Sequence, residues 1–221
     1  MFSTHNAEFV NKLGLEKVIV FHKGTAFNLS KELSEKDRDY LAANPNTDIF
    51  KLLYSKKSIL VEGITEELLI KSYLHTRRDL NDIKVLSFHK GYTKIIDIWA
   101  AINVGSGNKL GVVRDYDDEP NAQENHEKRQ NSQIIVCTTK GDTLETDITK
   151  TNFGLLKKTY GAEYGWSDMT EAQLVEDWKG KKSHVMLRIC HDMIAGELNG
   201  FALPPHIQRV IDFLQGDINE S

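Results

Sequence analysis

An alternation of short apolar segments and helical patterns in the first half of the chain restricts its fold more than any other feature. Each apolar segment has the length of a strand, and the segments between them carry apolar residues at helical spacing. The predicted strands and helices are, in chain order, 58–61, 65–75, 82–88, 92–102 and 110–113. Consecutive strands that are joined through helices run parallel, with right-handed crossovers. The pattern therefore predicts an α/β fold with a parallel sheet flanked by helices.

The rest of the chain adds a fourth strand at 133–137 and mostly helical segments. Before the sheet we expect a helix, two extended segments and two further helices, at 7–13, 17–21, 26–29, 34–43 and 48–54. The polar segment 119–131 is expected to be an exposed helix or a mobile loop. The additional helical segments after the fourth strand are expected at 144–150, 153–160, 171–178, 183–198 and 205–214.

The composition bears on partners and on the cellular compartment. The 221 residues carry a formal net charge of −4, so a surface for nucleic acid has to be a local basic patch or depend on a metal. No apolar segment approaches the roughly 20 residues of a membrane span, and the first residues have no signal-peptide pattern. Cys137 and Cys190 belong to no CxxC pair. We therefore expect buried free thiols and a cytoplasmic protein.

Acidic residues directly follow two of the predicted strands. Glu62 comes after Val61, and Glu66 lies four residues further on, on the same face of a helix. Asp115 and Asp117 follow the third strand, and their spacing puts both on one side of an extended segment. If the first and third strands are neighbours, these carboxylates converge at the carboxyl edge of the sheet, where ligands bind in α/β proteins. They repel one another unless a cation holds them, and Mg²⁺ and Mn²⁺ prefer such oxygen ligands.

The alternative is a purely local role for these acids. Glu62 and Glu66 would then only favour a helix N-terminus, with Thr65 as its N-cap, and Asp115 and Asp117 would be loop acids. The occurrence of both motifs in one chain favours the metal site. Glu67 is expected to be a solvated helix residue.

The part of the chain that follows the fourth strand supplies three further candidates for the same site. Glu145 follows the strand and its turn, as a metal ligand or as an ordinary acid of a first helical turn. Lys181 and Lys182 precede the helix predicted at 183–198, where a lysine would stabilise the charge that develops on a cleaved phosphate. The alternative is a solvated Gly-Lys-Lys linker, and the sequence does not separate the two lysines.

Other catalytic chemistries find little support. The eight histidines are scattered and show no zinc-ligand spacing, so zinc is not expected. The sequence has no P-loop, no GxGxxG and no nucleophile elbow. Nucleotide binding and acyl transfer are therefore poorly supported.

A Val-Glu-Gly motif at 61–63, followed by Thr65-Glu66 and by the Asp-x-Asp pair at 115–117, resembles the Toprim domain of topoisomerases, primases and recombination proteins. The Thr-Glu variant and the long helical tail are most similar to the OLD (overcoming lysogenisation defect) family of nucleases. The resemblance covers about residues 1–195. In that family a Toprim nuclease follows an ABC-type ATPase. The opening Ser-Thr-His-Asn at 3–6 resembles the end of such an ATPase, with Asn6 in place of the usual serine.

The resemblance implies a two-metal endonuclease or nickase that acts on DNA with Mg²⁺ or Mn²⁺, in phage defence or DNA processing. The residues that it assigns to the site are Glu62, Glu66, Asp115, Asp117 and Glu145 as metal ligands, Glu62 and Asp115 as catalytic acids, and Lys182 or Lys181 as the catalytic lysine.

The resemblance also implies a division of the chain and a set of partners. Residues 1–55 correspond to the end of the ATPase and connecting helices, 56–198 to the Toprim catalytic domain, and 199–221 to a C-terminal helix and tail. The chain itself would bind no ATP. Its partners would be DNA and the N-terminal ATPase domain of the parent protein, through which it would oligomerise.

Three other functions are alternatives to a DNA endonuclease. A Toprim ribonuclease of the rRNA-maturation type is one, although the ATPase-like opening and the long helical tail argue against it. A topoisomerase needs a tyrosine on another domain, and none is identifiable here. A non-catalytic, metal-binding module for DNA interaction or dimerisation is the third, and the intact Glu66 and Asp-x-Asp pair favour catalysis over it.

Overall fold

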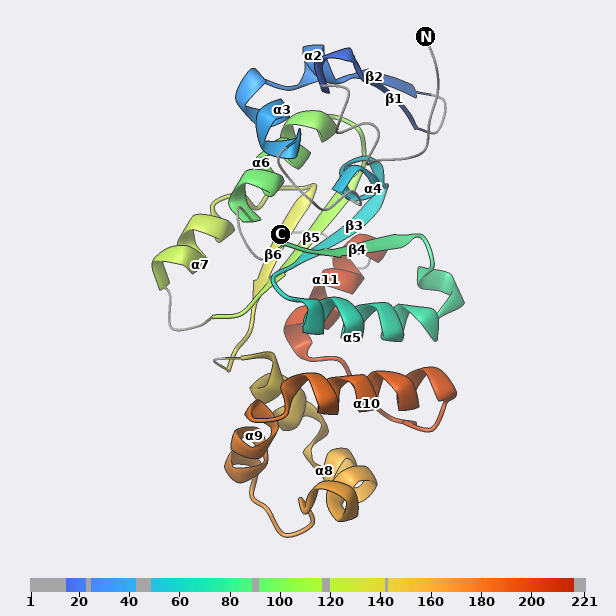
Figure 1. Cartoon of the computed structure of the whole chain (residues 1–221), viewed down its shortest axis with the longest axis vertical. Helices are drawn as coiled ribbons and strands as arrows, with labels where there is room; N and C mark the ends of the chain where they lie inside the picture. The colour runs from blue at the N-terminus through green and yellow to red at the C-terminus, as the bar shows by residue number, and fades with distance from the viewer. Residues whose placement is uncertain are drawn as a thin grey trace.

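A computed structural model describes residues 15–22, 25–42, 49–88, 92–116, 120–141 and 143–216. Its centre is a four-stranded sheet in which every pair of neighbouring strands is parallel (Figure 1). The strands are β3 (Lys57–Val61), β4 (Ile83–Ser87), β5 (Lys109–Arg114) and β6 (Ile134–Thr138). They lie in the order β4-β3-β5-β6. The predicted α/β fold with a parallel sheet flanked by helices is confirmed.

Helices cover both faces of the sheet, because the central strands bury both of their faces. In β3, Ile59 and Val61 belong to one hydrophobic core and Leu60 to the other, and all three side chains are fully buried. The covering helices are α5 (Ile64–His75) and α11 (Pro205–Gln215) on the first face, and α4 (Ile49–Tyr54) and α6 (Tyr92–Asn103) on the second (Figure 1).

The N-terminal segment lies over the second face. Its elements are η1 (Leu15–Lys17), the antiparallel pair β1 (Ile19–His22) and β2 (Thr25–Asn28), α2 (Leu29–Glu32) and α3 (Glu35–Ala42). Leu15, Leu29 and Leu41 share one core with Trp99 of α6. This core therefore contains residues from both sides of position 55, and the division of the chain at that position stays a prediction. The helix predicted at 7–13 lies outside the described residues.

The helices after β6 form a further layer and then return to the sheet. They begin with α8 (Leu144–Tyr164), α9 (Glu171–Lys179) and α10 (Lys182–Ala195). Helix α10 packs along α5, so these helices lie outside α5 (Figure 1). Helix α11, which falls within the predicted C-terminal segment 199–221, packs on β5 and β6 and belongs to the main core. No helix in the described ranges is long and apolar enough to cross a membrane.

Two local features of the helices agree with the sequence patterns. The polar segment after β5 contains α7 (Pro120–Glu127), which has no buried residue. In α8, Asn152 leaves helical geometry, with φ −122° and ψ 17°, at the point between the two predicted helices. The Asn152 side chain donates to the carbonyl of Ala202 at 2.8 Å and accepts from its amide at 2.8 Å. This pair of bonds ties the break to the segment before α11.

Helix α11 crosses the sheet at a glycine. Gly111 lies in β5 between Ile59 of β3 and Ile135 of β6. A Cβ atom at this position would clash with Cγ1 of Val210, a fully buried residue of α11. The close approach of helix and strand therefore depends on the missing side chain.

We predict that Gly111→Ala lowers the free energy of unfolding by about 1–3 kcal/mol, because the added methyl group overpacks the contact with Val210. Urea denaturation measures the change. Val210→Ala in the same chain should recover part of it, as a favourable coupling in a double-mutant cycle. The matched control is Gly154→Ala in α8, where nothing lies within 4 Å of an added Cβ. That helical position should gain about 0.5–1 kcal/mol. Wild-type stability of Gly111→Ala would contradict this docking of α11.

Candidate active site

The carboxyl ends of β3 and β5 lie side by side, which is the condition under which the sequence predicts that the acids converge. Val61 is paired with Ser87 of β4 and with Val113 of β5. Glu62 follows β3 at the level of Arg114, and Asp115 follows one residue later. Both acids are half-buried. The register therefore places these two acids at one edge, between the middle strands of the sheet.

The turn from β3 into α5 is built around a glycine rather than a side-chain cap. Helix α5 begins at Ile64, and Gly63 is its N-cap in an extended conformation without a side-chain hydrogen bond. The prediction of Thr65 as the N-cap is wrong, because the helix starts before it. A Cβ atom on Gly63 would lie 2.6 Å from Oε2 of Glu66. Glu66 thus folds back over the start of its own helix, into space that only glycine leaves open.

Glu66 is a buried acid in an acidic environment. It is 6% exposed, and its Oε2 atom has no hydrogen-bond partner. Burial raises the pKa of Glu66, the negative charges of Glu145 and Glu62 raise it further, and backbone N–H groups at the helix start only partly oppose this. The structure therefore brings Glu62 and Glu145 close enough to Glu66 for their charges to act on its carboxylate.

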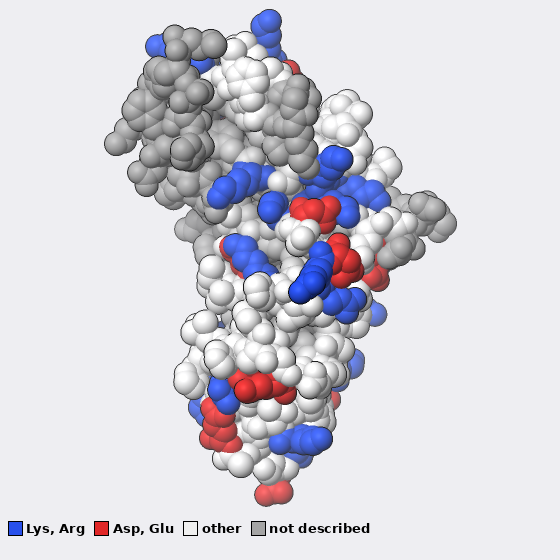
Figure 2. Space-filling model, turned by 90° about the vertical axis from the view of Figure 1, so that its right-hand side faces the viewer, with Lys and Arg blue, Asp and Glu red and all other residues white. Residues whose placement is uncertain are grey.

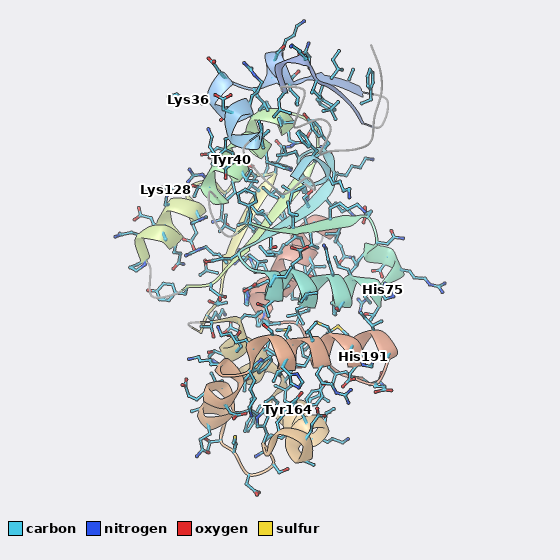
Figure 3. All side chains as sticks on the ribbon, in the orientation of Figure 1. Lys36, Tyr40, His75, Lys128, Tyr164 and His191 are labelled. Atoms are coloured by element: carbon cyan, nitrogen blue, oxygen red, sulfur yellow. The ribbon has the colours of Figure 1, made fainter. Side chains whose placement is uncertain are left out.

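Glu145 reaches the same edge from the fourth strand, and a lysine faces it. It lies in the first turn of α8 and its side chain is 3% exposed. Nζ of Lys182, at the start of α10, lies 3.3 Å from Oε2 of Glu145. Lys181 points elsewhere: its Nζ donates to Asp177 at 2.9 Å and lies 6.0 Å from the ring centroid of Tyr164, in the α8–α10 layer (Figure 3). Tertiary structure thus separates the two lysines.

A buried aspartate–histidine pair fixes the turn that carries Glu145. The Asp147 carboxylate accepts from the backbone N–H groups of Lys140 at 2.9 Å and Gly141 at 2.7 Å. Nδ1 of His206, from the first turn of α11, lies 3.1 Å from Oδ2 of Asp147. Burial alone would raise the pKa of Asp147, but these hydrogen bonds outweigh it and lower the pKa. The sequence gives no signal for this contact, because His206 is distant along the chain.

Glu67 is an acid whose environment the sequence pattern predicts wrongly. It was expected to be solvated, yet it is 8% exposed. Its Oε2 accepts from the backbone N–H of Ser87 at 2.7 Å, and its Oε1 accepts from Lys71. Burial would raise the pKa of Glu67, but these partners outweigh it and lower the pKa. Glu67 therefore ties α5 to the end of β4, one residue from Glu66.

Arg114, the last residue of β5, is a further charged group at this edge. It is 4% exposed, and its Nη1 atom has no hydrogen-bond partner. The sequence showed it only as the residue before Asp115. A buried guanidinium at the end of β5 offsets part of the negative charge that gathers beside it.

The donors at the edge suit a hard divalent cation in kind and in charge. They are carboxylate oxygens, and Oε2 of Glu66 is buried without a partner. Within the ranges that the structure describes, however, no group of three or more His, Cys, Asp or Glu side chains is arranged to hold a metal ion. Asp117 lies outside those ranges. The ligand roles of Glu62, Glu66, Asp115, Asp117 and Glu145 therefore stay predictions.

Comparisons of the chain with protein-family models, with curated proteins and with solved structures find no match. The resemblance to Toprim nucleases therefore rests on the motifs in the sequence, and the functional argument rests on the chemistry of this edge.

Glu66→Gln and Glu67→Gln are expected to change stability in opposite directions in metal-free buffer at pH 7.5. The pKa of Glu66 is raised, so its stabilising influence is present below the unfolded value of 4.5 and is lost as pH rises through the folded pKa. Removing that charge should therefore raise the melting temperature. The pKa of Glu67 is lowered, so its contribution is present above 4.5 and is lost as pH falls through the folded pKa. Its removal should destabilise by about 1–3 kcal/mol.

Thermal melts in EDTA from pH 4 to 8 measure both effects. The gain from Glu66→Gln should shrink toward zero below pH 4.5, where the wild-type carboxyl is protonated in both states. Shifts of the same sign in the two variants at pH 7.5 would contradict the different environments of these neighbours.

Proposed function

We propose that this chain is a divalent-metal-dependent endonuclease that hydrolyses phosphodiester bonds in DNA. One observation carries the proposal: the charges of Glu145 and Glu62 both act on the buried carboxylate of Glu66 at the carboxyl edge of the sheet, and Lys182 faces Glu145 at 3.3 Å. Mutually repelling carboxylates are costly to keep together unless a cation binds there. The resemblance of the sequence motifs to Toprim nucleases supports the same chemistry.

Glu62, Glu66, Asp115 and Glu145 would hold the metal ion, with Asp117 completing the set. A bound divalent ion would polarise the phosphate and lower the pKa of an attacking water. The chain's own contribution is to hold the ligands: Gly63 gives room for the Glu66 carboxylate, and the Asp147–His206 pair fixes the turn before Glu145. Rigid support of this kind keeps catalytic groups oriented.

Lys182 is the proposed catalytic lysine. Its side chain is about half exposed beside a buried acid, so it would be accessible to an approaching phosphate. In the absence of substrate it offsets the charge of Glu145. An ammonium group there would stabilise the negative charge that builds up on the phosphate during cleavage.

The proposal extends to partner and compartment. By the resemblance, the nuclease would act with an N-terminal ATPase domain of a parent protein and would itself bind no ATP. A reducing, cytoplasmic setting suits Cys137 and Cys190, which are both buried free thiols. Burial raises the pKa of Cys137 to about 11, which keeps this thiol protonated and unreactive.

Mn²⁺ or Mg²⁺ is expected to switch on nicking of supercoiled plasmid, and Asp115→Asn to abolish it. The variant removes a negative charge beyond a strand but no packing, so the fold should survive. The matched control is Asp168→Asn, an exposed acid before α9, which should cleave at the wild-type rate. Gel assays with and without EDTA measure both.

Melting temperature gives a second readout. Millimolar Mn²⁺ should raise it, because an ion that binds only the folded state stabilises that state, and Glu62→Gln should reduce the shift. Cleavage of RNA but not of DNA would support the ribonuclease alternative. Metal-dependent stabilisation without cleavage of either would support a non-catalytic module. Cleavage at the wild-type rate by Asp115→Asn would contradict the assignment of the active site to this edge of the sheet.

Lys182→Ala should lower single-turnover cleavage by about a hundredfold or more while DNA affinity changes little. Lys181→Ala is the matched control. It removes the same charge from the neighbouring residue, whose side chain pairs with Asp177 rather than with Glu145. It should cleave within a few-fold of wild type. Equal losses in the two variants, or a loss only in Lys181→Ala, would overturn the role given to Lys182. Fluorescence anisotropy in EDTA provides the binding measurement.

A further inference from the structure

A basic groove lies beside the edge strand of the sheet, away from the acidic edge. It has a volume of about 580 Å³ and is lined by residues of α4, α5, η2 (Arg78–Leu80) and β4. Because β4 is the outermost strand, no further strand among the described residues covers its outer side. The side of the molecule with the end of α5 and the start of β4 faces the viewer in Figure 2, where lysine and arginine side chains gather across the middle.

Every charged residue that lines the groove in the described ranges is basic. The basic lining residues are Lys51, Lys71, His75, Arg77, Arg78 and Lys84. Nearby acids offset part of this charge: Glu67 binds Lys71, and Asp79 lies 3.8 Å from Arg77. Arg78 and Lys84 are exposed and form no ion pair with any residue that the structure describes. The groove therefore concentrates positive charge in a chain whose net charge is −4.

An isolated lysine on an edge strand has a simpler explanation, because it discourages association with another strand. That explanation fits Lys84 alone. It does not explain why Lys51 of α4, Lys71 of α5 and Arg78 of η2 converge on the same hollow from separate segments of the chain. Convergent basic side chains around a groove match the spaced negative charges of a nucleic-acid backbone.

We propose that this groove binds the phosphate backbone of duplex DNA at a distance from the acidic edge and so holds the substrate while its scissile phosphate lies at that edge. The inference rests on the proposed nuclease function. Helix α5 joins the two places, since Glu66 lies in its first turn and His75 at its far end (Figure 3). Twelve residues of helix span about 18 Å, the length of about five phosphates along one DNA strand. The groove thus acts as a non-specific grip that extends the site along the duplex.

The test is the salt dependence of binding by the full chain to a fluorescein-labelled DNA duplex, measured by anisotropy in EDTA. Arg78→Gln/Lys84→Gln removes two charges from the groove. Lys36→Gln/Lys128→Gln removes two charges on the opposite side of the molecule and is the matched control (Figure 3). The groove variant should bind DNA about tenfold more weakly at 50 mM salt. Its slope of log affinity against log salt concentration should become shallower by about two. The control should keep the wild-type slope. Circular dichroism melts check that both fold.

The outcomes separate this inference from the proposed function. If the salt slope depends on the groove residues but no divalent metal makes the chain cut DNA, the groove is supported and the proposed nuclease function is contradicted. If cleavage depends on metal but the salt slope of DNA binding is the same in the wild type and the groove variant, DNA binding by the groove is contradicted and the proposed nuclease function stands. Equal losses of DNA affinity in both double variants also contradict binding by the groove, since affinity then follows the net charge of the protein. No binding of wild type to the duplex at 50 mM salt also overturns it, in favour of an acidic protein partner.

Discussion

Burial of β3 on both faces is the constraint from which the arrangement of the site follows. Ile59 and Val61 belong to one core and Leu60 to the other, so this strand has to lie inside the sheet with helices above and below. Its neighbours on either side are then β4 and β5. The carboxyl end of β3 emerges between theirs, and whatever follows Val61 is held at the centre of the carboxyl edge, where open α/β sheets bind their ligands. Glu62, Gly63 and α5 follow.

The start of α5 assigns different tasks to two adjacent acids. Glu67 has its charge satisfied by Lys71 and by the backbone of Ser87, and it fastens the helix to the neighbouring strand. Glu66 lies over Gly63 with one oxygen unpartnered and acidic neighbours around it. A fold that fully satisfies one carboxylate and leaves the next one unsatisfied keeps strain where a ligand would relieve it. The hydrogen bonds of Glu67 hold the start of α5 in place beside Glu66.

Much of the secondary structure was accessible from the sequence, because hydrophobic periodicity is a local property. The three strands and two helices of 58–115 and the fourth strand were predicted within a few residues. So was the break between the two halves of α8, where polar residues interrupt the helical pattern before Phe153. The capping of α5 was not, because Thr65 is a good N-cap by residue type while the path of the chain made Gly63 the cap.

By itself, the sequence determined the parallel sheet, the order of its strands along the chain, and the placement of Glu62 and Asp115 directly after two of those strands. The parallel register, which pairs Val61 with Val113, then brought those acids to one edge. Only the tertiary structure decided which lysine faces Glu145, since Lys181 and Lys182 are equivalent by type and position and differ only in which way α10 turns them. Packing also decided the basic groove, whose residues come from segments far apart in the sequence. Periodicity and residue type act over a few positions, whereas charges and side chains from distant segments meet only when the helices pack on the sheet.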